Sequence, residues 1–89
     1  MKIKDGFVLR NVSDAYVVIA LGDAAKNFHG MITLNESGAL LWKTLAAGCD
    51  SADALVAALL AEYEITPEIA SRDVGLFLDR VRKAGLLAE

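Results

Sequence analysis

Thr-Leu-Asn-Glu-Ser-Gly-Ala-Leu-Leu-Trp, residues 33–42, is the stretch where a two-residue hydrophobic period ends and a helical period begins. Leading into it, residues 30–34 (Gly-Met-Ile-Thr-Leu) have the apolar and β-branched content of a short strand. Beyond position 35, apolar or small residues recur at the i, i+3, i+4, i+7 spacing of one helix face: Gly38, Leu41, Trp42 and Leu45. The stretch therefore predicts a strand followed directly by a helix.

The residue between the two periods is Asn35, which suits a helix N-cap because its side-chain oxygen can accept from a backbone N–H in the first turn. Glu36 then places a negative charge near the positive end of the helix. Gly38 lies on the apolar face, where glycine costs about 1 kcal/mol of helix propensity relative to alanine. We therefore expect the helix to approach the sheet closely at Gly38, and Trp42 to anchor it in the core.

Three strands are expected in the first part of the chain, at residues 7–12, 15–21 and 28–34. A Ser-Asp pair typical of turns separates the first two, and residues 22–27 carry turn formers and polar groups before the third. Connections this short cannot form parallel crossovers, so the simplest topology is an antiparallel meander. The third strand would then lie at the edge of the sheet.

Three helices follow, predicted at residues 36–47, 52–63 and 67–84. The first and last are each followed by a glycine, Gly48 and Gly85, which suits the left-handed conformation that ends many helices. The last begins with Thr-Pro-Glu, which combines a capping hydroxyl, a proline at the first turn and an acidic residue. The sequence predicts an α+β fold, a three-stranded antiparallel sheet followed by three helices, winged-helix-like, in a single domain over residues 1–89.

The last helix has two distinguishable faces. At 100° per residue, one arc gathers the apolar residues Ala70, Val74, Phe77, Leu78 and Val81, which should pack on the core. The flank beside it mixes aliphatic residues with charges of both signs, namely Ile69, Asp73, Leu76, Arg80 and Lys83. That mixture favours a recognition edge over a plain solvated face.

Composition excludes several function classes. The 89 residues are 55% hydrophobic and 24% charged, which argues against disorder and favours partner binding or self-association, such as a homodimer. A net charge of −3 argues against binding of nucleic acid, which depends on clustered Lys and Arg. No window reaches the roughly 20 apolar residues that span a bilayer, so we expect a cytoplasmic protein that does not bind membranes.

Residues suited to catalysis or metal binding are scarce. His29 and Cys49 are the only histidine and cysteine, so neither a zinc site nor an internal disulfide is expected. Cys49 follows a predicted helix end and has no histidine near it in sequence, so a Cys-His nucleophile is not expected. We expect no enzyme activity, no cofactor and no metal.

Two other functions remain open from the residues alone. Two helices joined by a short turn beside a small sheet match the outline of a winged-helix transcription regulator. The last helix carries Arg72, Arg80, Arg82 and Lys83 but also Glu68, Asp73 and Asp79, so it is only slightly positive. A structural dimerisation module is the third interpretation.

Residues 30–42, Gly-Met-Ile-Thr-Leu-Asn-Glu-Ser-Gly-Ala-Leu-Leu-Trp, resemble the signature of PqqD-like proteins, in which a Leu-Asn-Glu-Thr/Ser segment leads into an aliphatic and aromatic helix. The stripe at residues 55–63, the Thr-Pro helix start and the terminal Val-Arg-Lys-Ala-Gly-Leu-Leu at 81–87 are similar to the rest of that pattern. The resemblance covers nearly the whole chain. The family includes coenzyme PQQ synthesis protein D and the recognition elements of peptide-modifying pathways.

The resemblance implies a peptide chaperone that binds the leader of a ribosomally made precursor by strand addition and presents it to a modifying enzyme, such as a radical SAM enzyme. It places the peptide in a cleft between the third strand and the third helix. Carried over, that cleft would be lined by Phe28, His29, Gly30, Met31, Ile32, Thr33, Ile69, Asp73, Leu76, Arg80 and Lys83. The turn after the first helix differs from the Cys-Asp-Gly of the PQQ protein, so the resemblance leaves the pathway open between PQQ and another modified peptide.

Overall fold

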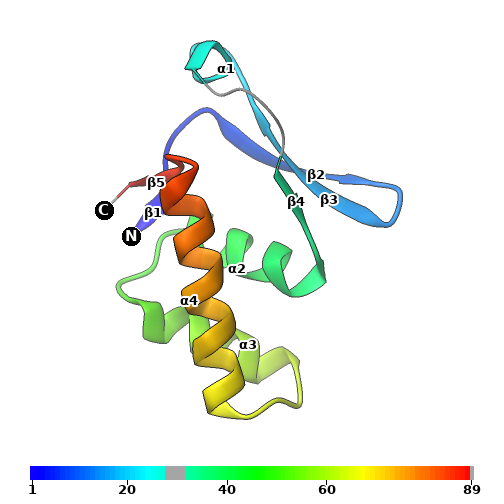
Figure 1. Cartoon of the computed structure of the whole chain (residues 1–89), viewed down its shortest axis with the longest axis vertical. Helices are drawn as coiled ribbons and strands as arrows, with labels where there is room; N and C mark the ends of the chain where they lie inside the picture. The colour runs from blue at the N-terminus through cyan, green and yellow to red at the C-terminus, as the bar shows by residue number, and fades with distance from the viewer. Residues whose placement is uncertain (28–31, 89) are drawn as a thin grey trace.

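The computed structural model describes residues 1–27 and 32–88, arranged as a three-stranded sheet, a two-stranded ribbon and a group of helices (Figure 1). In chain order the elements are β1 (Lys2–Ile3), β2 (Phe7–Val12), β3 (Ala15–Ala20), α1 (Ala24–Asn27), β4 (Ile32–Leu34), α2 (Glu36–Ala46), α3 (Ala52–Glu62), α4 (Pro67–Lys83) and β5 (Leu87–Ala88). The predicted α+β class, with an antiparallel sheet leading into three main helices, is confirmed.

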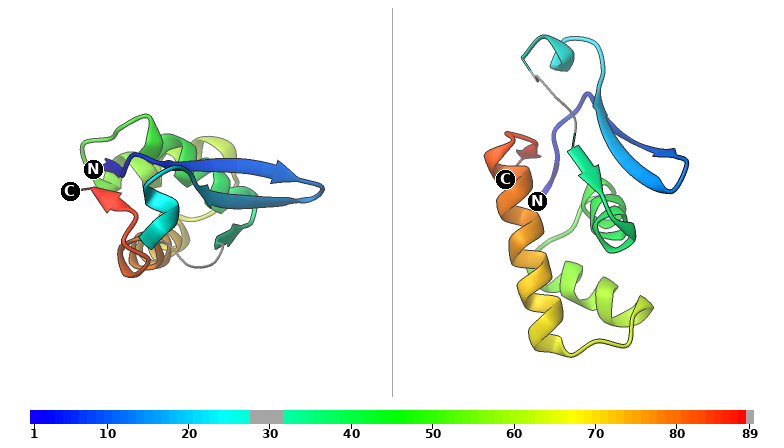
Figure 2. Two further views of the ribbon diagram at one scale, coloured as in Figure 1. Left: turned by 90° about the horizontal axis from the view of Figure 1, so that it is seen from above. Right: turned by 45° about the vertical axis from the view of Figure 1, so that its right-hand side comes forward.

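The sheet has the strand order β2-β3-β4, and both pairings are antiparallel, as the short connections predicted. Val18 stands opposite Leu9 on one side and Ile32 on the other, so these three side chains share a face. That face packs on the helices, and Val18 is fully buried. The β2–β3 hairpin projects beyond the helices at its turn (Figure 2), and β4 forms an edge of the sheet.

The helices enclose a core that the helical period anticipated closely. The five apolar residues predicted for the inner arc of α4 are all buried: Ala70, Val74, Phe77, Leu78 and Val81. Trp42 in α2 is 3% exposed and belongs to the same cluster, which confirms it as a core anchor. Leu60 in α3 is an exception, since it falls within the stripe at residues 55–63 but is 38% exposed.

The strand-to-helix junction has the predicted geometry. Asn35 is the N-cap of α2, and its side-chain oxygen accepts from the backbone N–H of Gly38 at 2.8 Å. A Cβ atom at Gly38 would lie 3.0 Å from Asn35 Oδ1 and 3.3 Å from Leu34 Cβ. The helix backbone thus lies directly against β4, so the absence of a side chain at Gly38 has a packing reason.

Helix ends also follow the sequence. Thr66 caps α4 by accepting from the Ile69 N–H, and Gly48 and Gly85 have φ angles of +92° and +77° just after α2 and α4. Ser51 occupies the N-cap of α3, but its hydroxyl makes no capping bond.

Four elements were not predicted or were predicted differently: β1, β5, α1 and β4. β1 pairs with β5, joining Ile3 to Leu87 across almost the whole sequence, and two-residue strands leave no periodicity to detect. The four-residue helix α1 replaces part of the expected turn at 22–27. Of the third strand expected at 28–34, the structure describes only β4, because residues 28–31 lie outside the described part.

No helix within the described ranges is both long and apolar enough to span a bilayer.

Candidate functional site

A groove of about 440 Å³ lies between β4 and α4, with α2 at its floor. The three elements that line it, β4, α2 and α4, are labelled in Figure 1 and can be followed by their colours in Figure 2. Its lining residues are Thr33, Leu34, Asn35, Ser37, Gly38, Leu41, Asp73, Leu76, Phe77 and Arg80.

The β4 side of the groove is a strand edge. Thr33 is exposed while Leu34 is 4% exposed, because successive residues of a strand point to opposite faces of the sheet. A groove that contacts both residues therefore runs along the side of β4 that faces away from β3. Such an edge presents backbone N–H and C=O groups that no strand of the described residues pairs.

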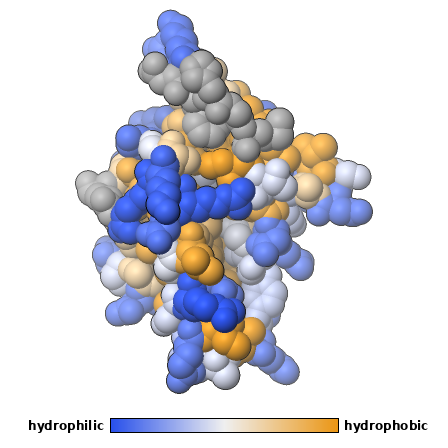
Figure 3. Space-filling model, in the orientation of Figure 1, coloured by the Kyte–Doolittle hydropathy of each residue, from blue (hydrophilic) through white to orange (hydrophobic). Residues whose placement is uncertain are grey.

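The α4 side presents apolar and charged groups in alternation. Leu76 is 63% exposed, the largest exposure among the exposed large hydrophobic residues described, and Asp73 and Arg80 lie about one turn on either side of it. Hydrophobic and strongly hydrophilic surface alternate along α4 on the face seen in Figure 3. The wall can thus contact apolar side chains at its centre and opposite charges at its two ends.

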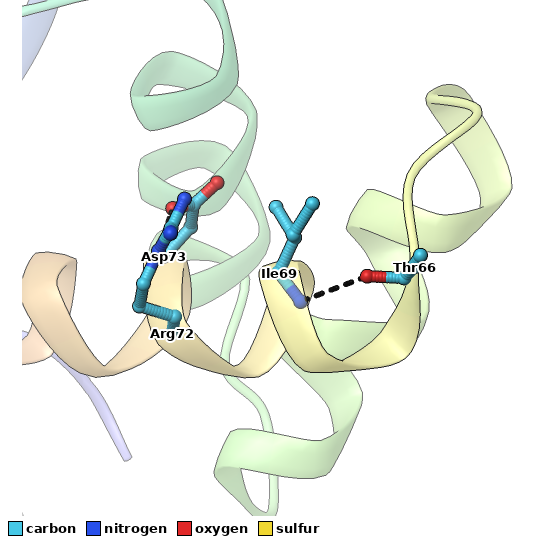
Figure 4. Close-up of polar contacts among 4 residues, drawn as sticks. All are labelled: Thr66, Ile69, Arg72 and Asp73. Atoms are coloured by element: carbon cyan, nitrogen blue, oxygen red, sulfur yellow. Dashed lines mark hydrogen bonds and ion pairs between the residues drawn. The ribbon is translucent and has the colours of Figure 1, made fainter.

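The charge at Asp73 is only loosely engaged. Its Oδ1 atom lies 3.6 Å from Nε of Arg72, and the side chains of Arg72 and Asp73 are 67% and 38% exposed. Figure 4 shows Asp73 and Ile69 on the same side of α4, with the Thr66 cap one turn earlier. An exposed pair of this kind contributes little to stability, about 0–1 kcal/mol, so Asp73 remains available to another cation.

The floor is formed by the start of α2, where the apolar residues are buried and the Asn35 side chain already accepts hydrogen bonds. Gly38 and Leu41 are buried, and the Asn35 side chain already accepts from the Gly38 N–H and from the Ser37 hydroxyl. No three His, Cys, Asp or Glu side chains within residues 1–27 and 32–88 are grouped to hold a metal ion. The groove offers backbone groups, apolar surface and separated charges, which suit binding of an extended chain.

The structure brings together four of the residues expected at the cleft: Thr33, Asp73, Leu76 and Arg80 line the groove. Ile32 instead faces the core at 8% exposure. Ile69 and Lys83 are exposed on α4 but do not line the groove. Phe28, His29, Gly30 and Met31 lie outside the described residues.

Six lining residues were not expected: Leu34, Asn35, Ser37, Gly38, Leu41 and Phe77. Their signals were present but were interpreted as structural, since Gly38, Leu41 and Phe77 occupy apolar helix positions. The start of α2 lies at the groove between β4 and α4. The helical period of the sequence shows that these positions are apolar, but it does not show that they line a groove.

Comparison with known proteins agrees with this architecture. The model of the family "Coenzyme PQQ synthesis protein D (PqqD)" matches residues 15–87. The structure of TbiB1 in complex with the TbiA(beta) leader peptide has a TM-score of 0.74 and 26% sequence identity, with 100% of both chains covered. The structure of a lasso peptide synthetase B1 complexed with the leader peptide has a TM-score of 0.75 and 19% identity over 99% of this chain and 96% of that chain.

A comparison with curated proteins gives no significant match. The family match spans most of the chain and includes all of β3, β4, α2, α3 and α4, which form the groove and its supports. The chain therefore belongs to the family of coenzyme PQQ synthesis protein D (PqqD).

Proposed function

We propose that this protein is a noncatalytic recognition element that binds the leader segment of a ribosomally synthesised precursor peptide. The observation that carries the proposal is the groove between the free edge of β4 and the mixed wall of α4. Family membership supports it, as does the likeness to TbiB1, whose structure contains a leader peptide.

Binding proceeds by strand addition. An extended peptide beside β4 would pair its backbone with the edge of the sheet and gain affinity that does not depend on its side chains. Leu76 and Phe77 would receive an apolar side chain, so the α4 wall would supply selectivity. Asp73 and Arg80 are seven residues apart, about 10 Å along the helix, and their opposite charges would favour one orientation of the peptide.

The bound precursor is presented to a modifying enzyme. The family resemblance points to a radical SAM enzyme, and the likeness to a lasso peptide synthetase component adds the enzymes of lasso peptide synthesis. The protein itself works in the cytoplasm without cofactor or metal. A homodimer is compatible with this role only where it leaves the edge of β4 free.

The test is calorimetric titration of purified protein with synthetic leader segments of short peptides, which are to be sought in the open reading frames beside its gene. We expect saturable binding with one peptide per chain, and none with a scrambled peptide of the same composition. Hydrogen exchange of the complex should slow at the β4 backbone, because strand pairing protects edge amides. Binding without protection at β4 would contradict strand addition, and no binding would contradict the function.

A further inference from the structure

A second pocket opens beside the end of the groove nearest Asn35. It has a volume of about 310 Å³ and is lined by Asn35, Glu36, Ser37, Leu59, Tyr63, Ile65 and Asp73. Three of these residues, Asn35, Ser37 and Asp73, also line the groove. The pocket, here called the side pocket, therefore adjoins the groove at the start of α2.

The walls of the side pocket are apolar. Leu59 is 1% exposed, and Tyr63 and Ile65 are half-buried against the core at the end of α3 and the turn into α4. A chain segment leaving the groove past Asn35 would thus meet aliphatic and aromatic surface. An alkyl stem placed there would be removed from water favourably.

The rim of the side pocket is acidic. Glu36 and Asp73 both line it, and no lysine or arginine is among its described lining residues. Burial raises the pKa of the Tyr63 hydroxyl, and the charges of Glu36 and Glu62 raise the pKa further. A negative potential at Tyr63 is consistent with the acidic rim.

We propose that the side pocket receives a lysine or arginine side chain of the bound peptide, just beyond the segment that pairs with β4. The inference rests on the proposed peptide binding and names a specificity determinant for it. The aliphatic stem would lie against Leu59 and Ile65, while the cation would reach Glu36 and Asp73 at the rim. Tyr63 also lines the pocket, and a cation placed over the face of its ring would gain a further favourable contact.

Other side chains fit this pocket less well. An acidic side chain would be repelled by the two carboxylates. A purely apolar side chain would use the walls but would also remove water from Glu36 and Asp73 without replacing it by a cation. Arg72 is the nearest described cation to Asp73, and its exposed 3.6 Å pair is easily exchanged for a peptide cation.

The experiment is a selection on immobilised protein from a display library of random peptides of about twenty residues. That length allows a strand of about five residues and a continuation beyond it. Selected peptides should share an apolar alternating segment with a lysine or arginine at a fixed distance from it. The same selection is run on Glu36→Gln and Asp73→Asn, with Glu68→Gln and Asp79→Asn as controls.

The controls match the test variants closely. Glu68 lies in the first turn of α4 as Glu36 lies in the first turn of α2, and Asp79 is exposed on the same helix as Asp73. Neither control residue lines the groove or the side pocket. All four substitutions remove one negative charge with little change in shape, and circular dichroism confirms that each variant is folded.

We expect the preference for a basic residue to fall in Glu36→Gln and Asp73→Asn and to persist in both controls. One selected peptide is then synthesised with its basic residue replaced by norleucine, which keeps the stem. This change should weaken binding to the wild type by about two- to fivefold, the scale of a partly exposed ion pair, and have no effect in a variant that combines Glu36→Gln with Asp73→Asn.

Peptides selected without a fixed basic position, or with the same preference in every variant, would overturn the side-pocket inference and leave peptide binding intact. Enrichment of no peptide over the bare support would overturn the proposed function, and the side-pocket inference with it. The two failures are therefore distinguishable.

Discussion

Asn35 and Gly38 form one unit, because the Asn35 side chain accepts from the Gly38 N–H at 2.8 Å while the missing Cβ of Gly38 leaves room for it. The pair holds the start of α2 against β4 and so fixes the floor of the groove. Its strength can be measured by substitution.

Gly38→Ala should destabilise the protein by about 1 kcal/mol, although alanine is the better helix former. The added Cβ would lie 3.0 Å from Asn35 Oδ1, so the cap or β4 must shift, which costs more than the propensity gained. Gly75→Ala is the matched control, because a Cβ there meets no atom within 4 Å. We expect it to stabilise the fold by about 0.5–1 kcal/mol in urea unfolding, and equal effects at both sites would contradict the close approach.

Trp42→Ala should lower the free energy of unfolding by about 3–5 kcal/mol, the usual cost of truncating a large buried aromatic. Trp42 is 3% exposed within the central cluster, whereas Leu76 is 63% exposed. Leu76→Ala should accordingly change stability by less than about 0.5 kcal/mol. Thermal and denaturant unfolding of both variants decides this.

Leu76→Asp should reduce affinity for the leader peptide at least tenfold, roughly the 1.4 kcal/mol or more that an apolar contact of this size provides. The groove places Leu76 at the centre of the α4 wall and leaves Ile69 outside it. Ile69→Asp, which introduces the same charge on the same helix, should alter affinity by less than about twofold. A comparable loss in both variants would show that the peptide extends beyond the groove.

Arg80→Glu should change the salt dependence of leader binding, because a charge at the groove rim acts mainly through long-range attraction. Lys83→Glu makes the same change in charge, but Lys83 does not line the groove. We expect titrations at several salt concentrations to differ from the wild type for Arg80→Glu and to coincide with it for Lys83→Glu.

Tyr63 should make the stability of the protein fall at alkaline pH. The pKa of its hydroxyl is raised by burial, then by Glu36 and Glu62, above the ordinary value of 10.0. Above pH 10.0 the unfolded chain therefore binds fewer protons than the folded chain, and stability falls as the pH rises through the folded pKa. Tyr63→Phe should remove this part of the decline in urea unfolding between neutral and alkaline pH, and an unchanged slope would contradict it.

The period of 3.6 residues predicted which side chains of α4 are buried, and the Asn35 and Thr66 caps predicted where α2 and α4 begin. These features are local, so the sequence contains them directly. The pairing of β1 with β5 is not local, since almost the whole sequence separates Ile3 from Leu87. Two residues of strand also carry no detectable alternation.

Only part of the groove was predicted, because some of its lining residues have a local sequence signal and others depend on how the elements pack. Asp73, Leu76 and Arg80 stood out because charged and apolar residues mix on one flank of a helix. Leu41 and Phe77 carried no such signal, because an apolar helix position is the same in sequence whether a neighbouring strand covers it or stops short of it. Whether Ile69 and Lys83 reach the groove depends on where α4 crosses α2, which only the packed structure determines.

The alternation of β4, buried at Ile32, exposed at Thr33 and buried at Leu34, has a consequence for any peptide laid beside it. A peptide strand paired with β4 alternates in the same way, so the side chains at its odd and even positions lie on opposite faces of the sheet. Insertion of one residue into the pairing segment of a leader exchanges the two sets of side chains, while insertion of two restores them. The protein would therefore tolerate length changes in its peptide by twos, and leader sequences that differ widely in composition would still share an even spacing between the side chains that lie on the same face of the sheet.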